Sequence, residues 1–412
     1  MSTLVVTDTR REASSRRVLF SLSLAELLAM SLWFTGTAVL PEVTKLWNSD
    51  IPLDHRLVLG SWLTVAVQIG FAVGALTFAL FNVPDIFSPI TVFVASAVAA
   101  AAANAGFAFV AARPLPAILL RGATGFFLAG VYPPGMKIIA GWFQKGRGLA
   151  LGIMIGALTV GSAVPHGVNS LGGIPWRAVV LLGSAQALLG GLVVALAVRE
   201  GPYAMPQSRL DLSQIGEIVR NRPLRLANLG YLGHMWELYS MWGWIAVVLA
   251  AASGWSKSKS ELETAAVIAI GAVGCIWAGV ASDRLQHSLD AARIAQRARV
   301  TMIAMSVSAV CCVAAALVFH SPVALLLVAM IWGIAVIADS AQFSAIISEV
   351  AQKSYVGTAL TLQTALGFLL TAFVIRLMAT IKEHYGWQIA LASMALGPLL
   401  GIWAMMGLTK KV

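Results

Sequence analysis

Apolar runs of about 20 residues recur along the whole chain, and they constrain its fold more than any other feature. A run of this length spans the hydrocarbon core of a bilayer as an α-helix. Strands of a membrane barrel show short alternating segments instead, so the runs argue against a barrel. The sequence therefore predicts an all-α membrane protein with twelve transmembrane helices. We expect these helices at residues 18–41, 57–81, 88–111, 115–140, 148–171, 177–198, 225–250, 262–281, 299–319, 322–347, 356–380 and 387–408.

Charged residues are scarce and unevenly placed. They make up 11% of the chain, which is too few for a water-exposed surface, since soluble proteins carry about 25%. A net charge of +10 suggests nucleic acid binding, but the positions of the basic residues argue against it. With the N-terminus in the cytoplasm, 18 of the 28 Lys and Arg residues fall on the cytoplasmic side and seven fall outside. This bias predicts a multi-pass protein of the cell inner membrane, with both termini cytoplasmic and no nucleic acid partner.

The longest polar stretch, from Arg199 to Pro223, divides the twelve spans into six and six. Its three prolines and its basic residues are typical of a linker at the cytoplasmic surface. The sequence thus predicts a cytoplasmic N-terminal tail, a six-helix bundle, a cytoplasmic linker and a second six-helix bundle. Their expected bounds are 1–17, 18–198, 199–224 and 225–412.

One phrase is repeated in the two halves at an offset of 211 residues. The pattern E-L-x-x-M-x-x-W at residues 26–33 returns at residues 237–244, and Trp176 and Trp387 keep the same offset. Two echoes at one offset, in corresponding spans, indicate an internal repeat. Repeats of six spans predict a central cavity between the halves, with the substrate near the bilayer midplane.

Two motifs resemble signatures of the major facilitator superfamily. GVASDRL at residues 279–285 is similar to its G-x-x-x-D-R loop signature, and RGATGFFLAG at residues 121–130 is similar to its Arg-x-x-x-Gly pattern. The resemblance implies alternating access, a cavity lined by the first, fourth, seventh and tenth spans, and a gating role for Asp283 and Arg284. RGATGFFLAGVYPPGMKIIAGWF also resembles bacterial nitrate/nitrite-type carriers, although the chain lacks their arginines in the second and eighth spans and their Gly/Asn-rich signature.

Seven ionisable residues lie well inside the spans, where a charge costs about 2.5 to 3.5 kcal/mol and must face protein or water. They are Glu26, Arg121, Lys137, His166, His234, Glu237 and Asp339. The five that are charged at neutral pH, together with His234, fall on the four spans that the resemblance implies around the cavity. We interpret Glu237 as the proton-coupling residue, with His234 and Glu26 as further proton sites, because low dielectric favours the protonated form of a carboxyl group. The repeat predicts that the two glutamates face each other across the cavity.

A second set of residues is predicted to contact the substrate. Trp33 and Trp244 share helix faces with the glutamates, Arg121 can recognise an anion, and Asp339 and Gln342 lie on one face of the tenth span. Each has a simpler alternative. The tryptophans can serve packing alone, Arg121 can neutralise an acid and so hold two helices together, and Asp339 can cap polar neighbours.

A charge pair is predicted to close the cytoplasmic side. Asp339 lies about 25 Å down the tenth span and Lys137 about 33 Å down the fourth, and the lysine side chain can reach upward along its stem, so we expect them to pair. Arg121 lies too near the outer surface to reach Asp339, and no bond between those two is expected. The run Pro133-Pro134-Gly135 predicts a bend or break in the fourth span.

These features together predict a secondary active, proton-coupled transporter of a small solute, and not an enzyme. Two alternatives remain, namely proton-coupled efflux of a cationic or amphipathic compound, and a membrane sensor that does not transport. No cofactor is expected, because nucleotide-binding motifs are absent. No metal is expected either, since His234 and Glu237 lack an obvious third ligand. The partners should be a small-molecule substrate and membrane lipid, and the protein should be a monomer.

Overall fold

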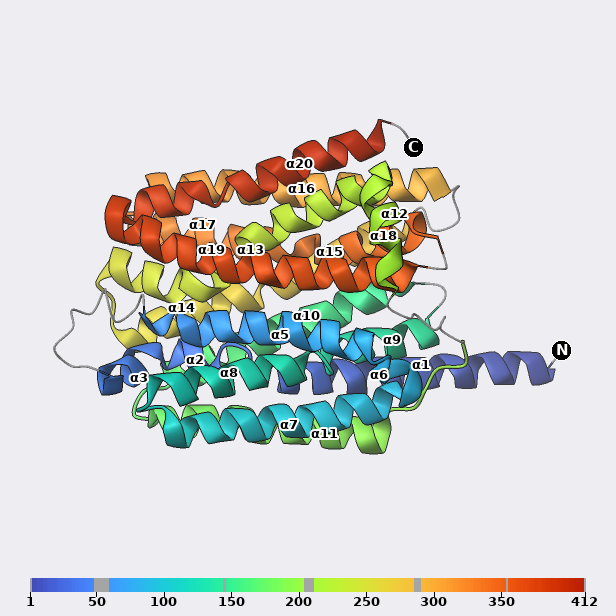
Figure 1. Ribbon diagram of the computed structural model, residues 1–412, viewed down its shortest axis with the longest axis horizontal. Helices are drawn as coiled ribbons and strands as arrows, with labels where there is room; N and C mark the ends of the chain where they lie inside the picture. Colours follow the sequence, from blue (N-terminus) through green and yellow to red (C-terminus); the bar gives the residue numbers. More distant parts are fainter. Residues whose placement is uncertain are drawn as a thin grey trace.

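A computed structural model describes residues 2–47, 59–143, 146–203, 211–284, 290–352 and 355–410, and every regular element in these ranges is helical. Long helices run side by side along the longest axis of the molecule (Figure 1). Both termini lie at one end of the bundle, which we call the terminal end, and α3 and the start of α14 lie at the opposite, distal end (Figure 1).

The described residues of the first half form ten helical segments. They are α1 (Ser2–Met30), α2 (Thr35–Ala38), α3 (Leu40–Trp47), α5 (Trp62–Leu80), α6 (Val83–Ile86), α7 (Pro89–Val110), α8 (Pro114–Leu128), α9 (Tyr132–Trp142), α10 (Arg147–Ser170) and α11 (Trp176–Ala197).

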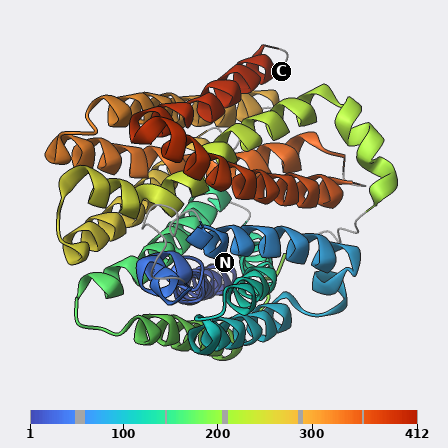
Figure 2. The ribbon, with the colours of Figure 1, turned by 60° about the vertical axis from the view of Figure 1, so that its left-hand side comes forward.

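A short connection, η1 (Leu212–Gln214) and α12 (Ile215–Arg220), leads to the second half. Residues 204–210 of the predicted linker lie outside the described residues. The second half contains α13 (Arg222–Ser253), α14 (Lys257–Ala269), α15 (Gly271–Asp283), α16 (Asp290–Leu317), α17 (Pro322–Ala338), α18 (Ser340–Val350), α19 (Val356–Ser393) and α20 (Leu396–Thr409). Figure 2 shows the helices of the second half stacked on those of the first.

Ten stretches of the described chain are long and apolar enough to cross a membrane, and they account for eleven of the twelve predicted spans. The stretch Val356–Thr409 holds two spans, because the helix is interrupted at Gly386, whose φ of 81° favours glycine. The first predicted span is the one left out. Its helix α1 ends at Met30, and a short break separates α1 from α2.

The fourth and tenth spans are both broken near their middle. Between α8 and α9 the break precedes Pro133 and Pro134, which occupy the first turn of α9, where a missing N–H is tolerated. The expected break in the fourth span is therefore confirmed. Between α17 and α18 the break falls at Asp339, which lies 211 residues after Leu128, the last residue of α8. The two halves thus repeat in structure as well as in sequence.

Glycines bring the helices together within and between the halves. A Cβ atom at Gly70 of α5 would lie 1.9 Å from the carbonyl oxygen of Gly122 in α8. A Cβ atom at Gly152 of α10 would lie 2.6 Å from the carbonyl oxygen of Cys275 in α15. Only glycine permits such an approach of two backbones, and the second one joins the two halves.

Candidate functional site

Glu237 lies inside the second half, in the middle of α13, and its side chain is buried. One carboxylate oxygen, Oε1, accepts hydrogen bonds from Ser308 Oγ at 2.5 Å, from Cys312 Sγ at 3.1 Å and from Trp332 Nε1. The donors come from α16 and α17. Three donors directed at one oxygen stabilise a negative charge at this position, in a part of the chain where a lone carboxylate would be costly.

His234 and Asp339 form a second buried contact beside Glu237. Nδ1 of His234 lies 2.8 Å from Oδ1 of Asp339, and both side chains are 2% exposed. The contact is close enough for an ion pair, but its angles do not make a hydrogen bond. The sequence pointed to Lys137 as the partner of Asp339, whereas the neighbour in the structure is His234. Because Asp339 sits at the break between α17 and α18, its orientation does not follow from its depth along an unbroken helix.

Glu26 occupies the equivalent place in the first half, with different surroundings. It is fully buried, and neither carboxylate oxygen has a hydrogen-bond partner among the described residues. A Cβ atom at Gly135 of α9 would lie 3.3 Å from its Oε2. The positions that precede Ser308, Cys312 and Trp332 by 211 residues hold Ala97, Ala101 and Arg121.

Each glutamate therefore points into its own half, and the expected placement across a shared cavity is not what the structure shows. The reason is the lateral position of the side chains. Glu237 contacts α16 and α17 of the second half, to which it belongs, and Glu26 lies beside α9 of the first half, to which it belongs. Periodicity placed both on one helix face, but it did not say toward which neighbouring helices that face turns.

Arg121 in α8 binds the backbone where α1 gives way to α2. Its Nη1 donates to the Leu32 carbonyl oxygen at 3.1 Å, to Thr35 Oγ1 at 3.0 Å and to Asn104 Oδ1 at 2.7 Å. Its Nη2 donates to the Trp33 carbonyl oxygen at 2.5 Å. A cation at the C-terminal end of α1 offsets the negative end of the helix dipole. Arg121 is thus directed at backbone carbonyls, and as expected it does not contact Asp339.

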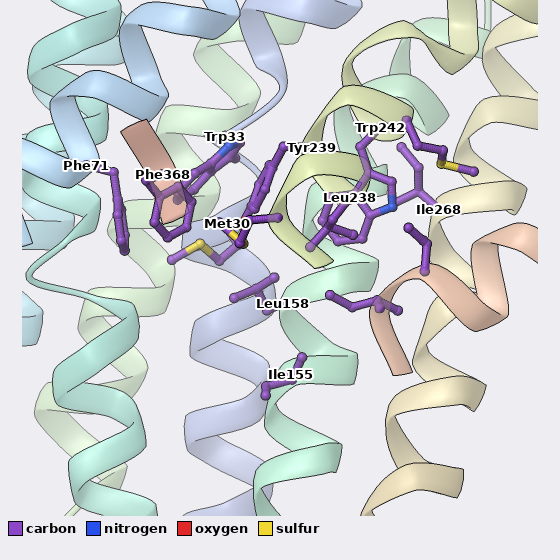
Figure 3. Packing of buried hydrophobic residues seen from close by; sticks show 14 of the residues in the cluster. Met30, Trp33, Phe71, Ile155, Leu158, Leu238, Tyr239, Trp242, Ile268 and Phe368 are labelled. Carbon is purple, nitrogen blue, oxygen red and sulfur yellow. The ribbon is translucent and has the colours of Figure 1, made fainter. Parts of the chain in front are cut away.

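Trp33 and Trp244, which share a place in the repeat, lie in different environments. The Trp33 ring packs on Phe71 of α5 and on two rings of the second half, Tyr239 and Phe368 (Figure 3). Trp244 stays inside the second half, where its Nε1 donates to the Ile375 carbonyl oxygen at 3.1 Å. Of this pair, Trp33 therefore packs between the two halves, and Trp244 packs within one of them.

Gln342 lies in a polar network of the second half. Its amide oxygen accepts from Nη1 of Arg297 at 3.0 Å, and Nη2 of Arg297 lies 3.1 Å from a carboxylate oxygen of Glu349. Although Gln342 follows Asp339 by one helical turn, it is tied to α16 and not to the rings around Trp33.

Asp283 joins the halves at the terminal end. Its carboxylate oxygens accept from the backbone N–H groups of Gly148 at 3.1 Å and Leu149 at 2.9 Å, in the first turn of α10. A carboxylate at the N-terminus of a helix is held by free N–H groups and by the helix dipole. Arg284 is exposed at the end of α15, and Lys137 is half-buried in α9.

Polar contacts also join the halves at the distal end. Nδ1 of His166 in α10 lies 2.6 Å from Oε2 of Glu261 in α14, and both residues are buried. Lys257 Nζ lies 2.5 Å from Glu42 Oε1 and 3.2 Å from Asn169 Oδ1. These contacts form what we call the distal network.

Sequence reasoning missed Glu261, Ser308 and Trp332. Glu261 sits at the edge of a span, and Ser308 and Trp332 are common packing residues. The one available signal was the repeat, because Ala97 and Arg121 stand at the matching positions of the first half. A difference between two otherwise similar halves marks a position where one half has acquired its own contact.

Comparison with known proteins gives one family and one fold. A family model described as Major Facilitator Superfamily matches residues 22–374. The fold is similar to a bacterial homolog of the human lysosomal transporter Spinster in an inward-facing, unoccupied conformation, at 16% identity, TM-score 0.67 and coverage of 96% of this chain and 97% of that one. No curated protein is significantly similar in sequence.

Two further solved structures share the fold. The human organic anion transporter MFSD10 is 14% identical, with a TM-score of 0.71 and coverage of 95% of this chain and 99% of that one. A D-xylose-proton symporter is 16% identical, with a TM-score of 0.68 and coverage of 95% and 97%. At these identities the likeness establishes the fold and leaves the solute open.

Proposed function

The chain belongs to the major facilitator superfamily, and from this premise we propose that it is a secondary active transporter that couples a small solute to protons by alternating access. The bundles 18–198 and 225–412 are the two moving bodies, joined by the linker 199–224. Both termini are cytoplasmic in the cell inner membrane, so the terminal end faces the cytoplasm.

The environment of Glu237 carries this proposal. A buried carboxylate with three donors on one oxygen is a group that can hold a charge inside the membrane, and protonation removes that charge. His234 lies one helical turn before Glu237 and forms a second buried pair with Asp339, and it is proposed as a second proton site. Glu26 is proposed as a further proton site. The D-xylose-proton symporter of the same fold is described as proton-coupled, which supports the class of mechanism.

Contacts at both ends supply the elements of two gates. Asp283 holds the first turn of α10 at the terminal end, and His166 and Glu261 hold α10 to α14 at the distal end. We propose that one set breaks while the other holds, so that the site between the halves opens to one side at a time. Lys137 and Arg284 belong to the terminal gate in this proposal. Arg121 acts by positioning the turn that carries Trp33, and Gln342 acts through the network of Arg297.

The test is uptake into liposomes that contain the purified full-length protein, with an imposed inward proton gradient. Labelled sugars, amino acids, organic anions and organic amines are offered one class at a time. The proposal expects that at least one solute accumulates above its external concentration, and that a protonophore abolishes the accumulation. Equilibration without accumulation would contradict proton coupling. Binding without any passage would favour the sensor.

Glu237→Gln is the matched variant, because it keeps size and hydrogen-bonding groups while removing the titratable group. It should lose accumulation and retain exchange of labelled for unlabelled solute. Glu200→Gln, at an exposed site after α11, serves as the control and should behave as the unmodified protein.

A further inference from the structure

Six aromatic side chains meet where the two halves touch. Three come from the first half and three from the second, and we call them the aromatic junction; all except Phe34 are labelled in Figure 3. They are Trp33, Phe34, Phe71, Tyr239, Trp242 and Phe368. Ring centroids lie 5.0 Å apart for Trp33 and Phe71, 5.4 Å for Trp33 and Tyr239, and 4.3 Å for Phe71 and Phe368. Rings of one half therefore rest directly on rings of the other.

Movement of the halves must separate these rings. Whichever end opens, faces that now stack on each other across the junction become free to stack on something else. Aromatic faces prefer offset or tilted packing against other rings. A flat ring compound restores the contacts that opening removes.

The junction also contains two hydrogen-bond donors with no acceptor. Nε1 of Trp33 and Nε1 of Trp242 are buried, and neither has a hydrogen-bond partner among the described residues. Trp244 shows the ordinary situation, because its Nε1 donates to a backbone carbonyl oxygen. A buried N–H without an acceptor costs free energy, so two of them in one cluster call for an explanation. Acceptor atoms of a bound solute would provide it.

None of the six side chains carries a charge, and the two ionisable groups beside them, Arg121 and His166, have partners of their own. Arg121 holds the carbonyl groups of Leu32 and Trp33, and His166, whose ring centroid is 6.5 Å from that of Phe34, contacts Glu261. Recognition at the junction therefore depends on ring faces and hydrogen-bond acceptors, and not on the net charge of the solute.

We propose that the aromatic junction is the solute site and that its solute is an uncharged, planar aromatic or heteroaromatic compound with hydrogen-bond acceptors for the two indole N–H groups. This inference rests on the proposed function and names the class of its solute. The broken backbone between α1 and α2 presents the Trp33 ring, as unwound segments do in other transporters with discontinuous helices.

The test measures equilibrium binding to the purified full-length protein in detergent by isothermal titration calorimetry. Coumarin and caffeine are the probes, because both are neutral, planar and rich in acceptors. D-xylose lacks an aromatic face and benzoate is charged, so they are the comparison ligands. We expect saturable binding of at least one probe, and no binding of D-xylose or benzoate. The inference is overturned if neither probe binds, or if only a comparison ligand binds.

Two variants locate the site. Trp33→Phe and Trp242→Phe keep an aromatic face and remove only the N–H donor, so the fold should survive. Each should weaken probe binding by about tenfold, the equivalent of one good hydrogen bond. Trp403→Phe, at a side chain of α20 that is 58% exposed, is the control and should leave the affinity unchanged. Unchanged affinity in both junction variants would place the probe elsewhere and contradict the inference.

Binding at fixed pH requires neither transport nor a proton gradient, so this test and that of the proposed function can fail separately. If a probe binds at the junction but no solute accumulates in liposomes, the proposed coupling fails and the solute class stands.

Discussion

His166 and Glu261 link the two halves at the distal end, with Nδ1 of one residue 2.6 Å from Oε2 of the other and both side chains buried. The first residue belongs to α10 and the second to α14, so the contact has to break for the distal end to open. The sequence analysis did not single out the glutamate, yet the proposed gating role of the histidine depends on it.

Glu261→Gln should therefore open the distal end. The amide cannot form an ion pair with a protonated histidine. Removal of one partner from a buried pair destabilises the conformation in which the pair is formed by about 3 to 5 kcal/mol. Spin labels at Leu171 and Leu262, which are exposed on α10 and α14, should report a shift to longer distances. Glu263→Gln, which alters a contact within α14 only, should leave the distances unchanged. Equal distributions in both variants would exclude a gating role for the pair.

Asp283→Asn should have the opposite effect. The carboxylate at the N-terminus of α10 contributes about 0.3 to 1 kcal/mol through the helix dipole alone. Its neutralisation should favour opening of the terminal end, measured as a longer distance between labels at Arg199 and Ser348. Arg284→Gln changes an exposed neighbour, so it should have a smaller effect. A larger effect of Arg284→Gln would show that Arg284, and not Asp283, holds the terminal end closed.

His234→Asn and Asp339→Asn should each lower stability, because each leaves a buried polar partner unpaired. The double variant should recover part of the loss, as shown by its midpoint of thermal unfolding in detergent. The same cycle with Lys137→Met and Asp339→Asn is predicted to be nearly additive. Strong coupling in the second cycle and none in the first would show that Asp339 pairs with Lys137, as expected from the sequence, and not with His234.

Arg121→Lys should loosen the turn between α1 and α2. A lysine cannot reproduce the fork that holds the Leu32 and Trp33 carbonyl groups together, so at least one buried carbonyl loses its donor, at about 1 to 3 kcal/mol. Both the unfolding temperature and the affinity for the aromatic probe should fall, since Trp33 loses its anchor. A variant that loses stability but keeps full affinity would show that Arg121 is structural only.

The sequence was sufficient for the fold, because long apolar runs and a repeat at one offset leave few architectures. It was less informative about which side chains meet. The same phrase places Trp33 between the halves and Trp244 inside one of them, since α1 ends at Met30 while α13 continues unbroken to Ser253. A helix break turns the residues after it in a new direction, and a periodicity argument assumes that no break occurs.

Contacts between residues on helices far apart in the chain could not be predicted from the sequence either. Glu237 was singled out correctly as a buried acid, but its donors Ser308, Cys312 and Trp332 come from two helices far away in the chain. Which face of α16 turns toward α13 depends on how the helices pack. A single serine in the sequence does not indicate which way that face points. His234 and Asp339 were each predicted to matter, and only the structure shows that they adjoin.

The decisive measurement of proton coupling is accumulation by Glu237→Gln, compared with the unmodified protein in the same liposomes. The variant should exchange labelled for unlabelled solute at a rate close to that of the unmodified protein, yet no longer accumulate solute when a proton gradient is imposed. Accumulation at the level of the unmodified protein would contradict the account, because the charge on Glu237 would then have no part in coupling.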